Sequence, residues 1–243
     1  MMMVLGIPCI PILALVAYGV RRRIPKLAPP GENRGSSGAG KRTIRIVTLG
    51  ESTVAGLGMP SHNAAFTGLF AKHLSERLGA FVEWEACAQN GLMIDNAEAL
   101  YSRTVQTKNP DVILLAFGGN EAFRGRSPHR FTRDLRTLLT NLRDRSPLAF
   151  IVLLTPPPVE ILPVLPWILQ LPLGMFTTMY HRILLTMHNP QQRIIYAGER
   201  FTLLEAQKRI GRNAPVIDGI HPTELCSSLW AKSVDQCLSQ YYA

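Results

Sequence analysis

Two short segments contain the residue types needed for nucleophilic catalysis. Ser52 lies in GESTVAG (50–56), at the end of a β-rich run, where small neighbours leave its hydroxyl accessible. Asp218 and His221 lie three residues apart in DGIHP (218–222), in a loop before the last helical segment. This spacing lets the carboxylate bind one ring nitrogen and leaves the other facing a substrate. The three side chains therefore predict the nucleophile, base and orienting acid of a serine hydrolase.

Two further segments contain groups that can stabilise the oxyanion formed during such a reaction. Gly91 ends CAQNG (87–91) and offers an unhindered backbone N–H, and Asn120 in GGNE (118–121) offers a side-chain amide. The backbone N–H of Ser52 completes the predicted oxyanion hole. Each of these residues alone is more typical of an ordinary turn or helix cap. Their joint occurrence, each after a predicted strand, is what indicates a site.

The four segments together resemble the sequence blocks of the SGNH hydrolase superfamily, the GDSL esterases and lipases. The resemblance covers about residues 44 to 240. It implies a serine ester hydrolase of the esterase, lipase or lysophospholipase kind, with no metal and no organic cofactor. The resemblance implies that Ser52 is the nucleophile and that Ser52, Gly91 and Asn120 are the oxyanion donors. It also implies that Asp218 is the orienting acid and His221 the base.

Two residues depart from the pattern of that family. Glu51 and Glu121 stand where the family usually has Asp, so each side chain is one methylene longer. We interpret both as structural residues that shift the local hydrogen bonding. Two alternatives stay open: an acyl or acetyl transferase or deacetylase acting on cell-envelope carbohydrate, and an inactive membrane-tethered binding module.

The elements that must position these segments alternate between strands and helices, which predicts a three-layer α/β/α sandwich around a mostly parallel five-stranded sheet. The resemblance implies the flavodoxin-like strand order 2-1-3-4-5. We expect strands over about 44–49, 81–87, 112–117, 148–154 and 193–196. We expect helices over about 64–78, 95–103, 130–145 and 223–238.

The chain is predicted to have three parts: an N-terminal membrane-anchor helix (1–23), a flexible linker (24–43) and the esterase domain (44–243). The first twenty residues contain no charge and would span about 30 Å as a helix, the thickness of a bilayer core. Basic residues follow this run, which favours a single anchor with the catalytic domain in the cytoplasm rather than the periplasm.

The net charge of +9 is unevenly distributed. Residues 1–45 contain eight Lys or Arg and one Glu, a net charge of +7, which leaves +2 for the remaining residues. A nearly neutral body argues against a nucleic-acid partner, and no protein partner is inferred. The four cysteines have no metal-ligand spacing, and Cys226 and Cys237 lie too far apart along one predicted helix to form a disulfide.

Residues 161–180 form a second stretch of twenty uncharged residues. Its three prolines argue against a regular helix, and a membrane span here would divide the sheet. We weigh two interpretations: an apolar segment packed on the core, and a partly exposed flap that lines an acyl pocket or contacts lipid. The second makes Trp167, Leu165 and Leu169 candidate substrate-binding residues and favours an acyl-ester or lipid-like substrate.

Overall fold

The computed structural model describes residues 10–198, 208 and 215–243. Its centre is a six-stranded sheet with the order β1-β3-β2-β4-β5-β6, in which every pair except β1–β3 is parallel. The strands are β1 (Arg34–Ser37), β2 (Thr43–Gly50), β3 (Phe81–Ala88), β4 (Val112–Ala116), β5 (Phe150–Leu154) and β6 (Ile194–Ala197). Numbered from β2, the five parallel strands have the order 2-1-3-4-5, so the flavodoxin-like topology is confirmed.

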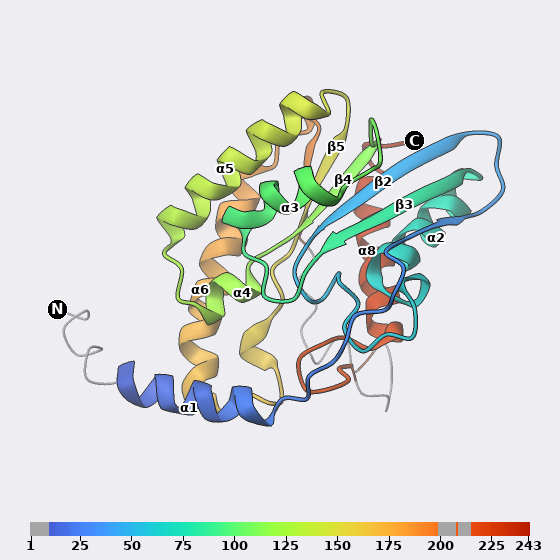
Figure 1. The fold of residues 1–243 in the computed structure, drawn as a ribbon. Helices are drawn as coiled ribbons and strands as arrows, with labels where there is room; N and C mark the ends of the chain where they lie inside the picture. Colours follow the sequence, from blue (N-terminus) through green and yellow to red (C-terminus); the bar gives the residue numbers. More distant parts are fainter. Residues whose placement is uncertain (1–9, 199–207, 209–214) are drawn as a thin grey trace.

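Helices cover both faces of this sheet (Figure 1). The longer helices are α1 (Ile10–Arg23), α2 (Phe66–Leu78), α3 (Ala97–Thr104), α5 (Pro128–Arg145), α6 (Trp167–Met187) and α8 (Glu224–Leu238). The shorter ones are α4 (Gly119–Phe123), η2 (His62–Ala64), η3 (Ile94–Asn96), η4 (Val159–Ile161) and η5 (Pro190–Gln192). The three-layer α/β/α prediction is confirmed.

The strands are buried on both sides because two apolar cores flank the sheet. One core joins the sheet to α3, α5 and α6, and the other joins it to α2 and α8. Within β2, Ile44 and Ile46 face the second core, whereas Val47 and Leu49 face the first. This burial explains the unbroken apolar runs of the central strands, which are typical of a covered parallel sheet.

The sixth strand, β1, lies inside the segment that was expected to be a flexible linker. It pairs antiparallel with β3, with Arg34 opposite Glu85. The Arg34 guanidinium lies 3.0 Å from the buried Glu85 carboxylate. A Cβ on Gly35 would lie only 2.4 Å from the Trp84 ring, so the glycine permits close packing of the strand on β3. The prediction of a linker is therefore wrong for residues 34–37.

The N-terminal apolar segment forms α1, which has 14 residues. At about 1.5 Å per residue it is roughly 21 Å long, shorter than the ~30 Å core of a bilayer. In the part of the chain that the structure describes, no helix has the length and hydropathy of a membrane span. The predicted membrane-anchor helix is therefore not supported by the described residues, and residues 1–9 lie outside them.

The uncharged stretch after β5 forms most of α6, a continuous helix of 21 residues that contains Pro172. The expectation that its prolines would prevent a regular helix is wrong. Pro163 and Pro166 precede the helix, and the single internal Pro172 removes only one backbone donor. Burial of Leu169, Thr177, Tyr180 and Leu184 against the body of the protein compensates for that loss.

Candidate active site

Three of the predicted site segments follow neighbouring strands at one edge of the sheet. In the register of the sheet, Gly50 at the end of β2 is opposite Ala88 of β3 and Ala116 of β4. The carboxyl ends of these parallel strands therefore meet. The turns that contain Ser52, Gly91 and Asn120 begin at this edge, at the point where strand order reverses.

Glu51, the residue before Ser52, links the β2 turn to the β4 turn. Its buried carboxylate accepts hydrogen bonds from the backbone N–H of Gly119 at 2.9 Å and from that of Asn120 at 2.7 Å. Burial and the nearby Glu121 carboxyl raise the pKa of Glu51, although these two hydrogen bonds act in the opposite direction. The side chain thus fixes the Asn120 backbone beside that of Ser52.

Glu121 links the β4 turn to the loop after β3 in the same way. Its carboxylate accepts hydrogen bonds from the N–H of Gly118 at 2.9 Å and of Ile94 at 2.7 Å. Burial raises the pKa of Glu121, against the effect of these bonds and of the Arg126 charge. The two residues that depart from the family pattern therefore connect the three turns.

Asn120 itself is half-buried, and its side-chain amide points toward the loop that contains Gly91. Its Nδ2 donates a hydrogen bond to the carbonyl of Leu92 at 2.8 Å. The same side-chain amide also lies near the Glu51 carboxyl, where a hydrogen bond from it lowers the pKa of Glu51 against the effect of burial. Gly91 adopts a φ of +77°, which favours glycine, and a Cβ at this position would meet no atom within 4 Å.

Asp218 and His221 form a hydrogen-bonded pair, as their spacing predicts. Asp218 Oδ2 lies 2.8 Å from His221 Nδ1, while Asp218 Oδ1 accepts the backbone N–H of Ile220 and of His221. Burial acts to raise the pKa of Asp218, but these bonds and the charge of His221 outweigh it and lower the pKa below its ordinary value. The contact leaves Nε2 as the ring nitrogen that can accept a proton.

The loop that carries this pair is closed by its own backbone. Val216 and Pro222 form an antiparallel bridge, and Ile217 N–H donates to the His221 carbonyl at 2.7 Å. Gly219, with a φ of +87°, packs so closely on Val164 that a Cβ would lie 2.9 Å from the Val164 Cβ. These contacts place the loop against the segment that precedes α6.

A contact near Gly58 connects this loop to the Ser52 turn. A Cβ on Gly58 would lie 3.4 Å from Ile217 Cδ1 and 2.8 Å from Leu27 Cδ1. Gly58 N–H also donates to the carbonyl of Ala28 at 3.0 Å. The segment after α1 is therefore part of this edge of the molecule. The only signal of this contact in the sequence is the pair of glycines at positions 56 and 58.

Ser52 is half-buried at the end of β2. Within residues 10–198, 208 and 215–243, neither its hydroxyl nor its backbone N–H forms a hydrogen bond, and the same holds for the N–H of Gly91. Ser52 Oγ and His221 Nε2 are thus not joined by a hydrogen bond here. Hydrogen bonds of this kind are often long in unliganded sites and tighten when substrate binds.

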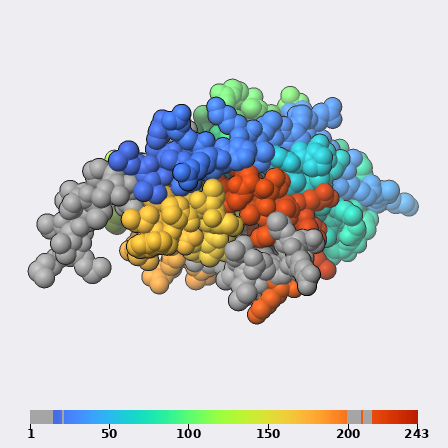
Figure 2. All heavy atoms as spheres, turned by 90° about the horizontal axis from the view of Figure 1, so that it is seen from below, coloured from blue at the N-terminus to red at the C-terminus, as the bar shows by residue number. Residues whose placement is uncertain are grey.

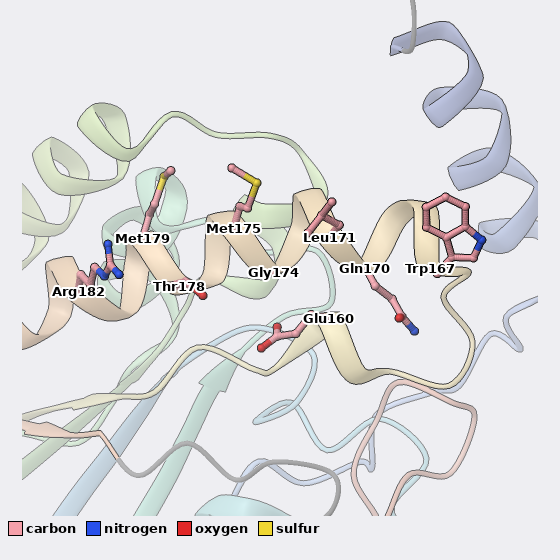
Figure 3. Close-up of a pocket in the computed structure, with 9 residues that line it drawn as sticks. All are labelled: Glu160, Trp167, Gln170, Leu171, Gly174, Met175, Thr178, Met179 and Arg182. Atoms are coloured by element: carbon pink, nitrogen blue, oxygen red, sulfur yellow. The ribbon is translucent and has the colours of Figure 1, made fainter. Parts of the chain in front are cut away.

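The three candidate substrate-binding residues do not share one environment. Leu165 and Leu169 are buried in the core that α6 covers, and Leu165 also lines a cavity beside α1, so their role in substrate binding stays a prediction. Trp167 is exposed and lines an open cavity of about 570 Å³ along α6. Figure 3 shows Trp167 on the same side of this helix as Leu171, Met175 and Met179.

Among the residues that the structure describes, no group of three or more His, Cys, Asp or Glu side chains could hold a metal ion. The three described cysteines, Cys87, Cys226 and Cys237, form no disulfide bond.

The sequence matches the model of the GDSL-like lipase/acylhydrolase family over residues 48–225. The chain belongs to this family, and it is a carboxylic ester hydrolase. The matched region includes all four turns. No curated protein matches the sequence.

Solved structures share the fold at low sequence identity. A GDSL-like lipase from Parabacteroides merdae is 17% identical, with a TM-score of 0.66 over 83% of this chain and 98% of that one. A lipase/acylhydrolase from Enterococcus faecalis is 18% identical, with a TM-score of 0.59 over 81% and 96%. An acetyl-xylooligosaccharide esterase from Geobacillus is 14% identical, with a TM-score of 0.60 over 85% and 96%.

Proposed function

We propose that the protein hydrolyses carboxylic esters through a triad of Ser52, His221 and Asp218. The observation that carries this proposal is the 2.8 Å contact between Asp218 Oδ2 and His221 Nδ1, in a loop that packs against the Ser52 turn through Ile217 and Gly58. The contact fixes the orientation of the imidazole and stabilises its protonated form.

In the first half of the reaction, Ser52 Oγ attacks the ester carbonyl while His221 Nε2 accepts the hydroxyl proton. The resulting oxyanion is stabilised by the N–H groups of Ser52 and Gly91 and by the side-chain amide of Asn120. When the tetrahedral intermediate collapses, His221 returns the proton to the departing alcohol. An acyl ester on Ser52 remains.

In the second half, a water molecule attacks the acyl ester and His221 Nε2 accepts its proton. The second tetrahedral intermediate releases the carboxylic acid, and His221 returns the proton to Ser52 Oγ. The enzyme is then restored. Throughout, Asp218 keeps its charge and holds His221 in the tautomer that presents Nε2.

Replacement of the nucleophile tests this proposal. Ser52→Ala should lower kcat for a short p-nitrophenyl ester by about 10⁴–10⁶-fold, because the proposed nucleophile is removed. Thr53→Ala, which removes the neighbouring half-buried hydroxyl, is the matched control and should keep wild-type turnover within a few-fold. Wild-type turnover in the Ser52→Ala protein would refute the triad.

We also propose that the protein acts at a membrane. The support comes from the apolar helix α1 and the basic residues at its end, Arg21, Arg22 and Arg23. Since no described helix has the length and hydropathy of a span, the form of attachment that we propose is peripheral, as developed below. The cytoplasmic location expected from the order of apolar and basic residues stays a prediction.

A further inference from the structure

The outward face of α6 is apolar, which is unusual for a helix at the surface. Trp167, Leu171, Met175 and Met179 follow one another at intervals of four residues, and their exposed fractions are 76%, 69%, 53% and 39%. Leu185, further along the helix, is 57% exposed. The outward face of a surface helix is ordinarily polar, so an apolar one indicates an interaction surface.

Helix α1 extends this apolar surface at the N-terminal end of α6. Its partly buried Val16, Gly19 and Val20 line a cavity shared with residues 163–166. The other side of α1 exposes Leu15 and Tyr18, at 72% and 60%. Figure 2 shows α1 (blue) lying alongside the segment that leads into α6 (yellow). We call Leu15, Tyr18 and the five exposed residues of α6 the α1–α6 surface.

The charged side chains of α1 and α6 are all basic, although one acidic residue, Glu160, lines the cavity along α6. Neither α1 nor α6 contains an acidic residue. Arg22 and Arg23 are exposed at the end of α1, and Lys26 is exposed shortly after it. The Arg22 guanidinium lies 5.7 Å from the centre of the Tyr18 ring, and Arg182 is exposed on α6. Basic side chains around exposed aromatic and aliphatic ones match a bilayer with anionic headgroups.

We infer that the α1–α6 surface docks onto an anionic lipid bilayer, with α1 and α6 lying along the interface. Trp167 and Tyr18 suit the headgroup region, because their rings combine an apolar body with a polar group. Leu171, Met175 and Met179 enter the acyl boundary, while the basic residues contact phosphate groups. A second copy of the chain would bring like charges together across the contact, which disfavours a dimer through this surface.

The same surface is connected to the catalytic edge on two sides. After α1, Leu27 and Ala28 contact Gly58 in the Ser52 turn. Before α6, Val164 contacts Gly219 in the loop between Asp218 and His221. Docking therefore places the catalytic edge near the bilayer. On the basis of the proposed triad, we infer that the substrates are esters of membrane lipids rather than water-soluble esters.

Vesicle binding by the full-length protein tests the docking surface. We expect cosedimentation with vesicles of phosphatidylcholine and phosphatidylglycerol, and at least about tenfold weaker binding to phosphatidylcholine alone or at high salt. The double variant Leu171→Gln/Met175→Gln should lower the partition coefficient by about tenfold or more and leave the hydrolysis of a short soluble ester unchanged. Leu148→Gln is the matched control. Leu148 is also an exposed apolar residue, but it lies between α5 and β5, outside the α1–α6 surface, so vesicle binding should not change.

Fluorescence gives an independent measurement of the same contact. Vesicles of brominated phosphatidylglycerol should quench the emission of Trp167. The other two tryptophans, Trp84 on β3 and Trp230 on α8, pack at the core on the other face of the sheet and should not be quenched. Trp167→Phe should abolish the quenching. Unchanged binding by the double variant, or equal quenching in the wild-type and Trp167→Phe proteins, would overturn the proposal. A wild-type dimer in sedimentation velocity that the double variant disrupts would also overturn it, in favour of a second copy.

The Ser52→Ala protein separates docking from catalysis. It should bind vesicles as the wild type does and release no fatty acid from lysophosphatidylglycerol. Binding together with wild-type hydrolysis in this variant would refute the triad and leave the docking surface intact. Hydrolysis of soluble esters by a wild type that does not bind vesicles would refute the docking surface and leave the triad intact.

Discussion

The two halves of the active site are held by different interactions. On the Ser52 side, Glu51 and Glu121 accept hydrogen bonds from four backbone N–H groups, three in the turn after β4 and one in the loop after β3. On the His221 side, Asp218 bonds only groups of its own loop. Oxyanion stabilisation depends on donors that are fixed before the reaction, whereas a base that takes and returns a proton needs mainly the correct orientation.

The same comparison explains opposite pKa shifts in three buried carboxyl groups. At Glu51 and Glu121, burial outweighs the backbone hydrogen bonds, and at Glu51 the nearby Glu121 carboxyl adds to it, so both pKa values are raised. At Asp218, the bonds and the His221 charge outweigh burial, so the pKa is lowered. In the proposed mechanism Asp218 must be charged, and it is the carboxyl group of the three whose environment favours the charge.

The largest expected effects come from the His221 half. His221→Ala should lower kcat by about 10⁴–10⁶-fold, because the proposed base is removed. Asp218→Asn should lower kcat by up to about 10⁴-fold, because the imidazole loses its orientation and tautomer. Turnover of a p-nitrophenyl ester measures both. The control is His129→Ala, which removes an exposed histidine of α5 and should leave turnover unchanged. An Asp218→Asn protein as active as the wild type would show that this half needs no orienting acid.

An intermediate effect is expected from the oxyanion donor on the Ser52 side. Asn120→Ala should lower kcat by roughly 10²–10³-fold, because one donor to the oxyanion is removed. It should also cost about 1 kcal/mol of stability through the lost bond to the Leu92 carbonyl. Asn96→Ala, at an exposed position before α3, is the control. A loss below threefold in kcat would remove Asn120 from the oxyanion hole.

The smallest expected effect concerns the pH dependence of stability on the Ser52 side. The pKa of Glu51 is raised from 4.5 to about 8, so the folded protein binds this proton more tightly than the unfolded chain does. The resulting stabilisation is complete below the unfolded pKa and is lost as the pH rises through the folded pKa. Urea unfolding at about pH 5, 7 and 9 should therefore show a fall in the free energy of unfolding that Glu51→Gln reduces.

The control for this measurement is Glu83→Gln, which changes a half-exposed carboxylate on β3. This variant should keep the wild-type pH dependence, since its ion pair with Arg45 is at the surface. If Glu51→Gln and the wild type lose stability in parallel as the pH rises, the raised pKa of Glu51 does not contribute to folding.

Much of the fold could be predicted from the sequence because the parallel strands and their helices have strong local patterns. The apolar runs of β4 and β5 and the inward leucines of α5 indicate their structure without reference to distant residues. β1 could not be predicted in this way, because its stability comes from Glu85 and Trp84, about fifty residues away. The composition of residues 34–37 alone is typical of a linker.

The site was predictable to a similar extent. The Asp218–His221 contact follows from a local spacing, and the meeting of the three turns follows from parallel strand order. The contact partners of Glu51 and the burial of Leu165 and Leu169 depend on packing between distant segments. A hydrophobicity pattern shows that a residue is apolar, but it does not show whether a pocket or the core surrounds it.

The central claim is that Ser52 is the nucleophile activated by His221. Its most direct test is labelling with a fluorophosphonate probe, followed by peptide mapping of the adduct. We expect one adduct per chain, located on Ser52, and labelling that is strongly slowed by His221→Ala and lost in Ser52→Ala. Labelling of another residue, or none in the folded wild-type protein, would contradict it.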